Sequence, residues 1–268
     1  MSTVLLFSGG VDSYAAYHYL KTRNAIGPTL LYLEMGHRYQ AEELKAIATL
    51  EGKGLISAVQ RRSGFKGLGD VEHKDGFIAG RNAFLILAAL ELNPDTVVLT
   101  VQKDETALSD RNAVFFGLMS TLMSQQLGKP VTITTPFWDM DKTDMVWFLK
   151  NSCSPEILAG SFDTVACYRP KDGKPCNDCA ACVRRAIAYA NNDLWELDAQ
   201  TVWRGSMMQV YLLACESDDS KYSVYRRIRT VRAIERAVAK GLYETNSLLA
   251  AAIEKAKSWE LLNDHHQG

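Results

Sequence analysis

Strand-type and helix-type segments alternate along the first 150 residues of this chain. Five short apolar runs have the composition of β-strands, and helical patterns separate most of them. The strand-type runs are residues 3–7, 29–35, 54–60, 96–101 and 131–136. The helical patterns are residues 12–22, 40–52, 81–93, 109–127 and 141–150. This alternation predicts an α/β fold in which helices cover a parallel sheet.

The turn after the first predicted strand reads SGGVDS. Its two glycines have no side chain that would hinder close approach of a ligand, and its serines and aspartate add polar groups at the start of the next helix. These residues are Ser8, Gly9, Gly10, Asp12 and Ser13. Free backbone amides and the positive end of the helix dipole would make the turn a binding site for phosphate oxygens.

Two common phosphate-binding signatures are absent from this turn. No lysine follows Gly10 as the pattern GxxxxGK[ST] requires, and the dinucleotide-binding spacing GxGxxG is missing. The turn instead resembles the SGGxDS loop of the ATP pyrophosphatases, the PP-loop enzymes. In those enzymes the loop holds the β- and γ-phosphates of ATP while an acid attacks the α-phosphorus, which leaves an acyl-adenylate. An ordinary strand-to-helix turn of small residues is the alternative.

Charge and hydrophobicity limit the partners of the chain. Lysine and arginine total 30 against 31 for aspartate and glutamate, so no charge asymmetry points to nucleic acid or an anionic membrane. No basic segment followed by a long apolar run opens the sequence, and no stretch reaches about 18 uninterrupted apolar residues. We therefore expect a cytoplasmic protein whose main ligand is a small molecule.

The six cysteines all lie in the second half of the chain. Disulfides would be reduced in the cytoplasm, so cysteines that are close in sequence favour a metal site. Such a cluster is formed by Cys167, Cys176, Cys179 and Cys182. Four thiolates predict one tetrahedral zinc ion with a structural role, and an iron–sulfur cluster is the alternative. Cys153 and Cys215 are isolated and are predicted to be ordinary packed residues.

Five segments in order make the resemblance more specific. They are SGGVDS, MGHRYQAE (35–42), AGRNAFL (79–85), GKPVTITTPFWDMDKTDMV (128–146) and the cysteine cluster followed by VRRA. Together they resemble the 7-cyano-7-deazaguanine synthase family of the PP-loop superfamily over residues 3 to about 188. The resemblance implies a Rossmann-like sheet of the adenine nucleotide α-hydrolase type.

The resemblance also implies an activity. Members of that family adenylate 7-carboxy-7-deazaguanine, let ammonia displace AMP to give an amide, and use a second ATP to dehydrate the amide to a nitrile. An ATP-dependent ligase that uses magnesium and forms a homodimer is thereby implied. A second interpretation keeps the adenylation but stops at the amide, or transfers the acyl group to another amine, conceivably on a protein. A tRNA-modifying PP-loop enzyme and an inactive zinc-bearing binding module are further alternatives.

Site residues follow from the same resemblance. The SGGVDS residues would hold the pyrophosphate and its magnesium, and Lys142 would reach a phosphate, so the implied catalytic residues are Asp12, Ser13 and Lys142. The nucleotide and the deazaguanine would lie against Arg38, Gly80, Arg81 and Asn82. Charge that builds on the pyrophosphate must be neutralised, which Lys142, magnesium and backbone amides can do. A solvent-facing helix lysine is the alternative for Lys142.

Two segments concern the substrate side. Residues 61–82 form a long glycine-rich connection, which we predict to be a substrate loop because it ends with Arg81 and Asn82 at a helix N-terminus. After the fourth strand the family has an aspartate-tyrosine pair and a glycine-tyrosine-proline-aspartate run in its base pocket. This chain reads QKDETALSDRN there, with Asp110 as the candidate for the last aspartate. The acid substrate, or the fate of its activated carboxylate, could therefore differ.

About 80 residues follow the cysteine cluster, whereas members of the family end soon after it. Helical patterns at 199–215, 222–240 and 245–262 have apolar stripes that must pack against the catalytic part or another chain, as in a homodimer or with a protein partner. The middle helix is basic, which indicates a solvated face or a docking surface. We predict an ATP-binding domain (1–150), a four-cysteine segment (151–190) and a helical extension (191–268).

Overall fold

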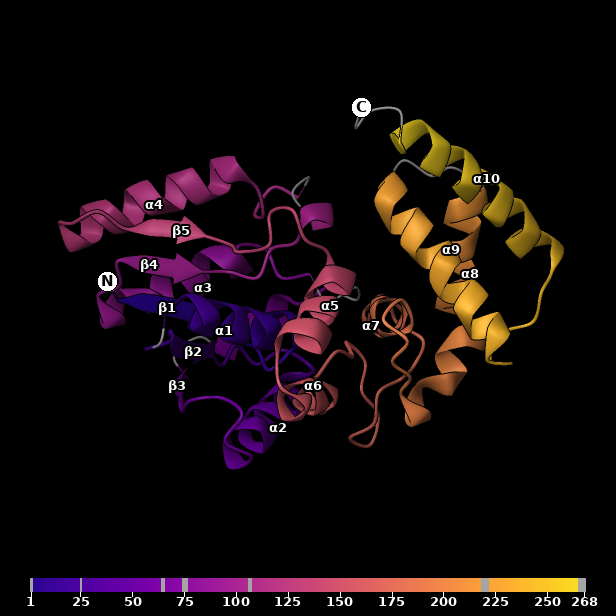
Figure 1. Cartoon of the computed structure of the whole chain (residues 1–268). Coiled ribbons are helices and arrows are strands. Elements are labelled where there is room, and N and C mark those ends of the chain that lie inside the picture. Colours follow the sequence, from indigo (N-terminus) through magenta and orange to yellow (C-terminus); the bar gives the residue numbers. More distant parts are fainter. Residues whose placement is uncertain are drawn as a thin grey trace.

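A five-stranded parallel sheet forms the centre of the N-terminal part of the protein, with the strand order β3-β2-β1-β4-β5 (Figure 1). The computed structural model describes residues 2–24, 26–63, 66–73, 77–105, 108–217 and 222–264. The strands are β1 (Thr3–Leu6), β2 (Thr29–Leu33), β3 (Val59–Arg62), β4 (Thr96–Val98) and β5 (Thr132–Thr134). The predicted Rossmann-like α/β fold is confirmed. From β1 the chain adds β2 and β3 on one side of the sheet and then β4 and β5 on the other, so the strand order reverses at β1. Sheets of this kind bind ligands at the point of reversal.

Each face of the sheet has its own apolar core, because successive strand residues point to opposite sides. Leu5 and Val98 pack on the face that carries α1, α2 and α5. Val4 and Val97 pack on the face that carries α3 and α4. These helices are α1 (Val11–Arg23), α2 (Gln40–Gly52), α3 (Arg81–Ala88), α4 (Ala113–Leu127) and α5 (Lys142–Ser152). Burial on both faces explains why the inner strands read as continuous apolar runs.

Several predicted boundaries differ from the structure, and two of the differences have a clear local cause. The third strand begins at Val59 rather than at residue 54, because Ile56 packs into the core from the loop before it. This edge strand itself carries polar side chains, so its apolar signal lay outside the strand. α4 begins at Ala113 rather than at residue 109, because the Asn112 side chain accepts a hydrogen bond from the Phe115 amide at 2.9 Å and caps the helix.

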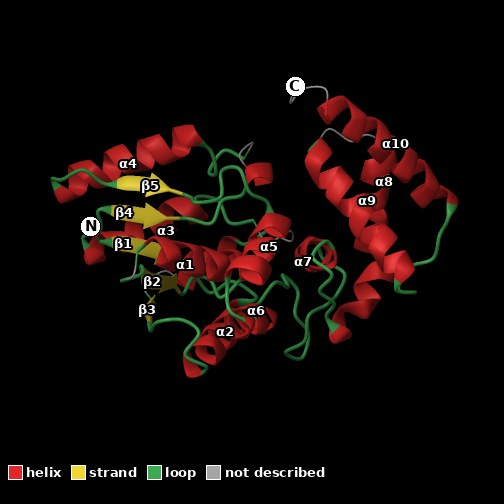
Figure 2. Cartoon of the chain, viewed as in Figure 1, coloured by secondary structure: helices red, strands yellow, loops and turns green. Residues whose placement is uncertain are grey.

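The C-terminal third is helical and packs on α7 (Ala180–Ala190), on the side away from the sheet (Figure 2). Its helices are α8 (Ser206–Glu216), α9 (Val224–Ala239) and α10 (Ser247–Asp264), which follow the short helix α6 (Pro155–Gly160) and α7 in the chain. Their apolar stripes share one core with α7, in which Cys182, Cys215 and Ile234 are buried. The apolar stripes of the extension are therefore largely covered within its own chain, and Cys215 is packed as predicted.

Two arginines of the basic helix α9 form ion pairs with aspartates of the same chain. Arg229 donates to Asp144 Oδ1 at 2.8 Å, and Arg236 donates to Asp193 Oδ1 at 2.6 Å.

No helix in the described part of the chain combines the length and the hydrophobicity needed to cross a bilayer. The division into three parts at residues 150 and 190 stays a prediction.

Candidate active site and metal centre

The SGGVDS turn connects β1 to α1 at the carboxyl edge of the sheet. Gly9 has a φ of +72°, and a Cβ atom on it would lie 3.0 Å from the carbonyl oxygen of Glu43 and 3.1 Å from Ile47 Cγ1. α2 therefore packs so closely beneath the turn that only glycine fits there without strain. Among the described residues, no side chain caps the start of α1 at Val11, which leaves its first turn suited to a ligand anion.

Asp12 joins this turn to two distant parts of the chain. Its Oδ1 accepts a hydrogen bond from Lys142 Nζ, and its Oδ2 accepts one from Gln102 Nε2 at 2.8 Å. Lys142 is the first residue of α5, so the helix start delivers its ammonium group to the turn. Its side chain is 16% exposed, which places it at the site rather than on a solvent-facing helix surface.

A cavity of about 230 Å³ lies against the SGGVDS turn. The predicted site residues that border it are Ser8, Gly10, Asp12, Arg81, Asn82 and Lys142. Three others support its edge without bordering it. Gly9 faces α2 on the underside of the turn, Ser13 Oγ donates to the Gly10 carbonyl at 2.9 Å, and Gly80 precedes α3 in a left-handed conformation with φ of +72°.

The C-terminal end of the predicted substrate loop, residues 61–82, lies at the cavity. Among its described residues only Arg81 and Asn82 border the cavity. Arg38 contacts an earlier part of this loop, since its Nε donates to Glu72 Oε1 at 2.7 Å. A ligand-binding role for Arg38 therefore stays a prediction.

Three charged residues that the sequence analysis missed also border the cavity. Arg111 Nη1 lies 2.6 Å from Glu105 Oε1, and Arg184 Nη1 lies 3.8 Å from the same oxygen. Burial alone would raise the pKa of Glu105, but Arg111, Arg184 and Lys142 lower it below its ordinary value, so the carboxylate is ionised. Glu105 and Arg111 follow β4 at the ligand-binding edge, a position that could have drawn attention to them; Arg184 has no such signal.

A buried polar cluster forms the wall of the cavity near β2 and α2. His37 Nε2 lies 3.0 Å from Glu43 Oε2, and the Tyr32 hydroxyl donates to the same oxygen at 2.8 Å. Burial and the neighbouring Glu43 raise the pKa of Tyr32, which keeps its hydroxyl a donor. The ring of Tyr39 contacts the His37 ring edge-on, and its hydroxyl accepts a hydrogen bond from Arg81 Nη1 at 3.3 Å.

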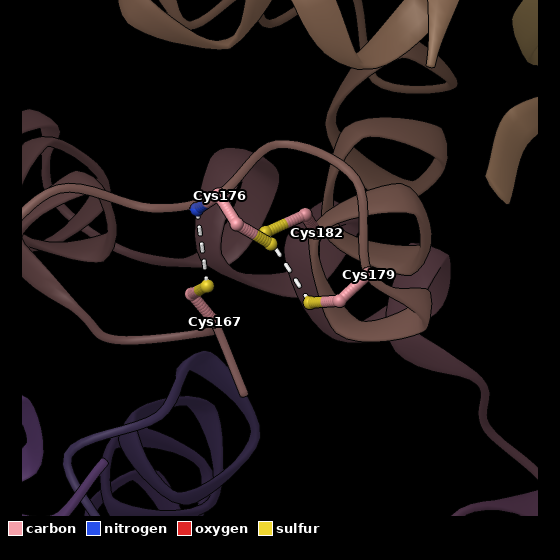
Figure 3. A group of neighbouring side chains, drawn as sticks. All are labelled: Cys167, Cys176, Cys179 and Cys182. Carbon is pink, nitrogen blue, oxygen red and sulfur yellow. Dashed lines mark hydrogen bonds between the residues drawn. The ribbon is translucent and has the colours of Figure 1, made fainter. Parts of the chain in front are cut away.

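The four clustered cysteines converge at one point (Figure 3). Their sulfur atoms all lie within 4.8 Å of one another, and Cys179 Sγ is 3.6 Å from Cys182 Sγ. Sulfurs around one zinc ion with bonds of about 2.3 Å would be about 3.8 Å apart, so the set fits a single tetrahedral ion. The amides of Arg169 and Cys176 donate to Cys167 Sγ at 3.3 and 3.2 Å, which favours a thiolate there.

One short segment links the cysteine cluster to the SGGVDS turn. The Val165 amide donates to the Gly9 carbonyl at 2.9 Å, and Cys167 follows two residues later. The next residue, Tyr168, borders the cavity and accepts a hydrogen bond from Arg184 at 2.9 Å. The cysteine centre therefore anchors a segment that forms part of the cavity wall.

Comparison with known proteins assigns the chain to a family. Residues 2–193 match the family described as queuosine biosynthesis protein QueC. The chain belongs to this QueC family. It is also 23% identical over 218 residues to a 7-cyano-7-deazaguanine synthase from Chlorobaculum parvum (strain DSM 263 / NCIMB 8327), a match that covers 71% of this chain and 92% of that protein. The recognised resemblance is confirmed at the level of the family.

The QueC family match includes the SGGVDS turn, Lys142 and the four cysteines. It ends before α8, α9 and α10, which begin at Ser206, Val224 and Ser247. The helical extension therefore lies outside the part of the chain that defines its family.

Proposed function

We propose that this chain is an ATP-dependent carbon–nitrogen ligase that adenylates 7-carboxy-7-deazaguanine and converts it with ammonia to 7-cyano-7-deazaguanine. Membership of the QueC family and the named relative support the general activity. The observation that carries the proposal is the pair of Asp12 and Lys142 in a cavity beside a glycine turn at a helix N-terminus. Activation of an acid by ATP needs a phosphate cradle, a cation at the leaving group and room for the acid in one place.

In the first step a carboxylate oxygen of the acid attacks the α-phosphorus of ATP, and the bond to pyrophosphate breaks. Both reactants are anions, so the site must reduce their repulsion. Lys142 would stabilise the charge that grows on the leaving pyrophosphate, and the amides of the SGGVDS turn would bind its oxygens. Asp12 would hold magnesium, which neutralises phosphate charge when bound. No side-chain nucleophile is needed, because alignment of the two substrates supplies much of the acceleration.

The remaining steps replace oxygen by nitrogen. Ammonia attacks the acyl carbon of the adenylate, AMP leaves and the nitrogen loses a proton, which gives the amide. A second ATP then adenylates the amide oxygen and releases pyrophosphate. Loss of that oxygen with AMP, together with the two protons on nitrogen, gives the nitrile. The same turn and Lys142 would serve both adenylations, since both release pyrophosphate.

We also propose that the cysteine centre binds one zinc ion with a structural role. All four coordination positions would be filled by Cys167, Cys176, Cys179 and Cys182, which leaves no open position for chemistry. The short distances between the sulfurs favour one ion, because cysteines of an iron–sulfur cluster bind different iron atoms and lie farther apart.

A second candidate function keeps the adenylation but stops at the amide, or passes the acyl group to another amine, including one on a protein. The observation that favours it lies after β4, where Glu105 and Arg111 border the cavity but Asp110, the candidate for the family's base-pocket aspartate, does not. A changed base pocket could accept a different acid or fail to support the second activation. A role on tRNA gains no support from α9, because Arg229 and Arg236 pair with aspartates of the same chain.

Mass spectrometry of the products from ATP, magnesium, ammonia and 7-carboxy-7-deazaguanine tests these candidates. We expect the nitrile, with AMP and pyrophosphate as the other products. Accumulation of the amide without the nitrile would support the second candidate. A complete lack of pyrophosphate release with this acid would contradict the proposed ligase.

A further inference from the structure

The two side chains that bind Asp12 come from the turn after β4 and from the start of α5, which directly follows another turn. Gln102 lies in the turn after β4, and Lys142 is the first residue of α5. The amide of Lys103 donates to the Met140 carbonyl at 3.1 Å, which ties the two turns together. The position of Lys142 at the phosphate turn therefore depends on what holds these turns.

Helix α9 of the extension holds the start of α5. Asp141 and Asp144 form a capping box there, in which the side chain of each accepts from the amide of the other at 2.9 and 3.0 Å. Arg229 of α9 donates to Asp144 Oδ1 at 2.8 Å, and its Nε lies 3.7 Å from Asp141 Oδ2. One guanidinium group thus engages both carboxylates that fix the helix turn containing Lys142.

Tyr225, one turn earlier on α9, contacts both turns. Its hydroxyl lies 3.3 Å from Asp144 Oδ2, and the Lys103 ammonium lies 5.1 Å from the centre of its ring. Arg229 donates to the same hydroxyl and lies 4.8 Å from the ring centre. The aromatic ring therefore lies between the segment that carries Gln102 and the helix that begins with Lys142.

We propose that Arg229 and Tyr225 are positioning residues of the ATP site, and that the helical extension is thereby part of the catalytic unit. The proposal rests on the proposed function only in taking ATP as the ligand of the SGGVDS turn. These residues lie beyond residue 193, where the family match ends. The extension would thus supply a support for the active site that the family-defining part of the chain lacks.

The electrostatics of the capping box agree with this role. Burial and the nearby Asp144 raise the pKa of Asp141, whereas Arg229 opposes the increase. Without the Arg229 guanidinium, less positive charge would offset the repulsion between the Asp141 and Asp144 carboxylates at the start of α5. The first turn of the helix would then lose the arrangement that aims Lys142 at Asp12.

The test compares Arg229→Ala and Arg229→Lys with Arg236→Ala, which removes another ion pair of α9, the one with Asp193. The measurement is ATP–pyrophosphate exchange with 7-carboxy-7-deazaguanine, together with thermal melting. For Arg229→Ala we expect kcat to fall by about tenfold to a hundredfold while KM for ATP changes little, because Lys142 acts mainly on the leaving group in the transition state. Arg229→Lys should recover part of kcat, and Arg236→Ala should retain it.

A double-mutant cycle shows whether Arg229 acts through Lys142. In a Lys142→Ala background, Arg229→Ala should cause little further loss of kcat, because the positioned group is already absent. Tyr225→Phe keeps the ring and should give a smaller loss than Arg229→Ala. Additive losses in the cycle, or equal kcat values for folded Arg229→Ala and wild type, would overturn this inference and leave the proposed function standing. A wild-type chain without any exchange would overturn the proposed function and this inference with it.

Discussion

Asp12 shares its two carboxylate oxygens between an ammonium and an amide group. Lys142 binds Oδ1 and Gln102 binds Oδ2, so the carboxylate proposed to hold magnesium and the cation proposed to bind phosphate meet at one point of the cavity. The Asp12 side chain is 23% exposed, so a ligand in the cavity can reach it. Under the proposed function, the charge of Asp12 would hold magnesium beside the phosphates.

Asp12→Asn should abolish pyrophosphate release while the melting temperature stays close to that of the wild type. The amide keeps the shape of the side chain, but it removes the charge that would bind magnesium. Asp139→Asn is the matched control, because Asp139 is exposed in the turn before α5 and does not border the cavity. Wild-type turnover in Asp12→Asn would show that the ATP assignment is wrong.

Glu105→Gln should raise KM for 7-carboxy-7-deazaguanine by about tenfold or more at saturating ATP, with KM for ATP unchanged. An ionised carboxylate in the cavity can accept hydrogen bonds from the N–H groups of a guanine-type ring, and the variant replaces one acceptor oxygen with a donor. Asp110→Asn is the control, since this side chain lies on the same segment but does not border the cavity. Equal KM values in the two variants would exclude Glu105 as a ring-binding residue.

Among the elements, α7 and the segment before it connect three features of the molecule. Cys179 and Cys182 lie at the start of α7, and Arg185 on the same helix donates to the Thr164 hydroxyl at 2.7 Å and to Glu196 Oε1 at 2.9 Å. The segment that follows Thr164 pairs with the phosphate turn through Val165. The cysteine cluster, the SGGVDS turn and the chain after α7 are therefore mechanically connected.

Removal of the metal should weaken ATP binding as well as stability. Stripped protein should melt at a lower temperature and bind a non-hydrolysable ATP analogue more weakly, because the segment that carries Cys167 no longer holds Val165 against the turn. Cys179→Ser should give largely insoluble protein, whereas Cys153→Ser, outside the centre, should behave like the wild type. Metal analysis that finds no zinc in protein prepared without chelator would contradict the prediction, as would unchanged affinity after stripping.

The elements differ in how far their sequences predict them. α1, α2 and α5 have clear helical spacing, whereas Lys142 was predicted only because the family resemblance implies it. β3 was misplaced because Leu55 and Ile56 carry the apolar signal in the loop before this polar edge strand. Arg184 was missed because its position in the cavity depends on how α7 packs against the sheet, which local patterns do not encode.

At the scale of the whole molecule, the extension and the metal centre share one core. Cys167, Cys179 and Cys182 are buried in the same cluster as Met208 of α8 and Ile234 of α9. The apolar stripes that suggested a second chain are thus largely covered within this one. The homodimer remains a prediction, which light scattering of the full-length chain tests: a particle of twice the chain mass supports it, and a monomer contradicts it.

Truncation after Asn191 should leave the remaining chain insoluble or without its metal. The cut removes α8, α9 and α10, so apolar side chains of α7 such as Val183 and Ile187 would face water beside the cysteine ligands. It also removes Arg229 and Tyr225 from the start of α5, so any soluble product should show reduced pyrophosphate exchange. Light scattering, metal analysis and the exchange assay on the same preparation check this. A soluble, metal-bound truncation with wild-type exchange would show that the catalytic part is independent of its extension.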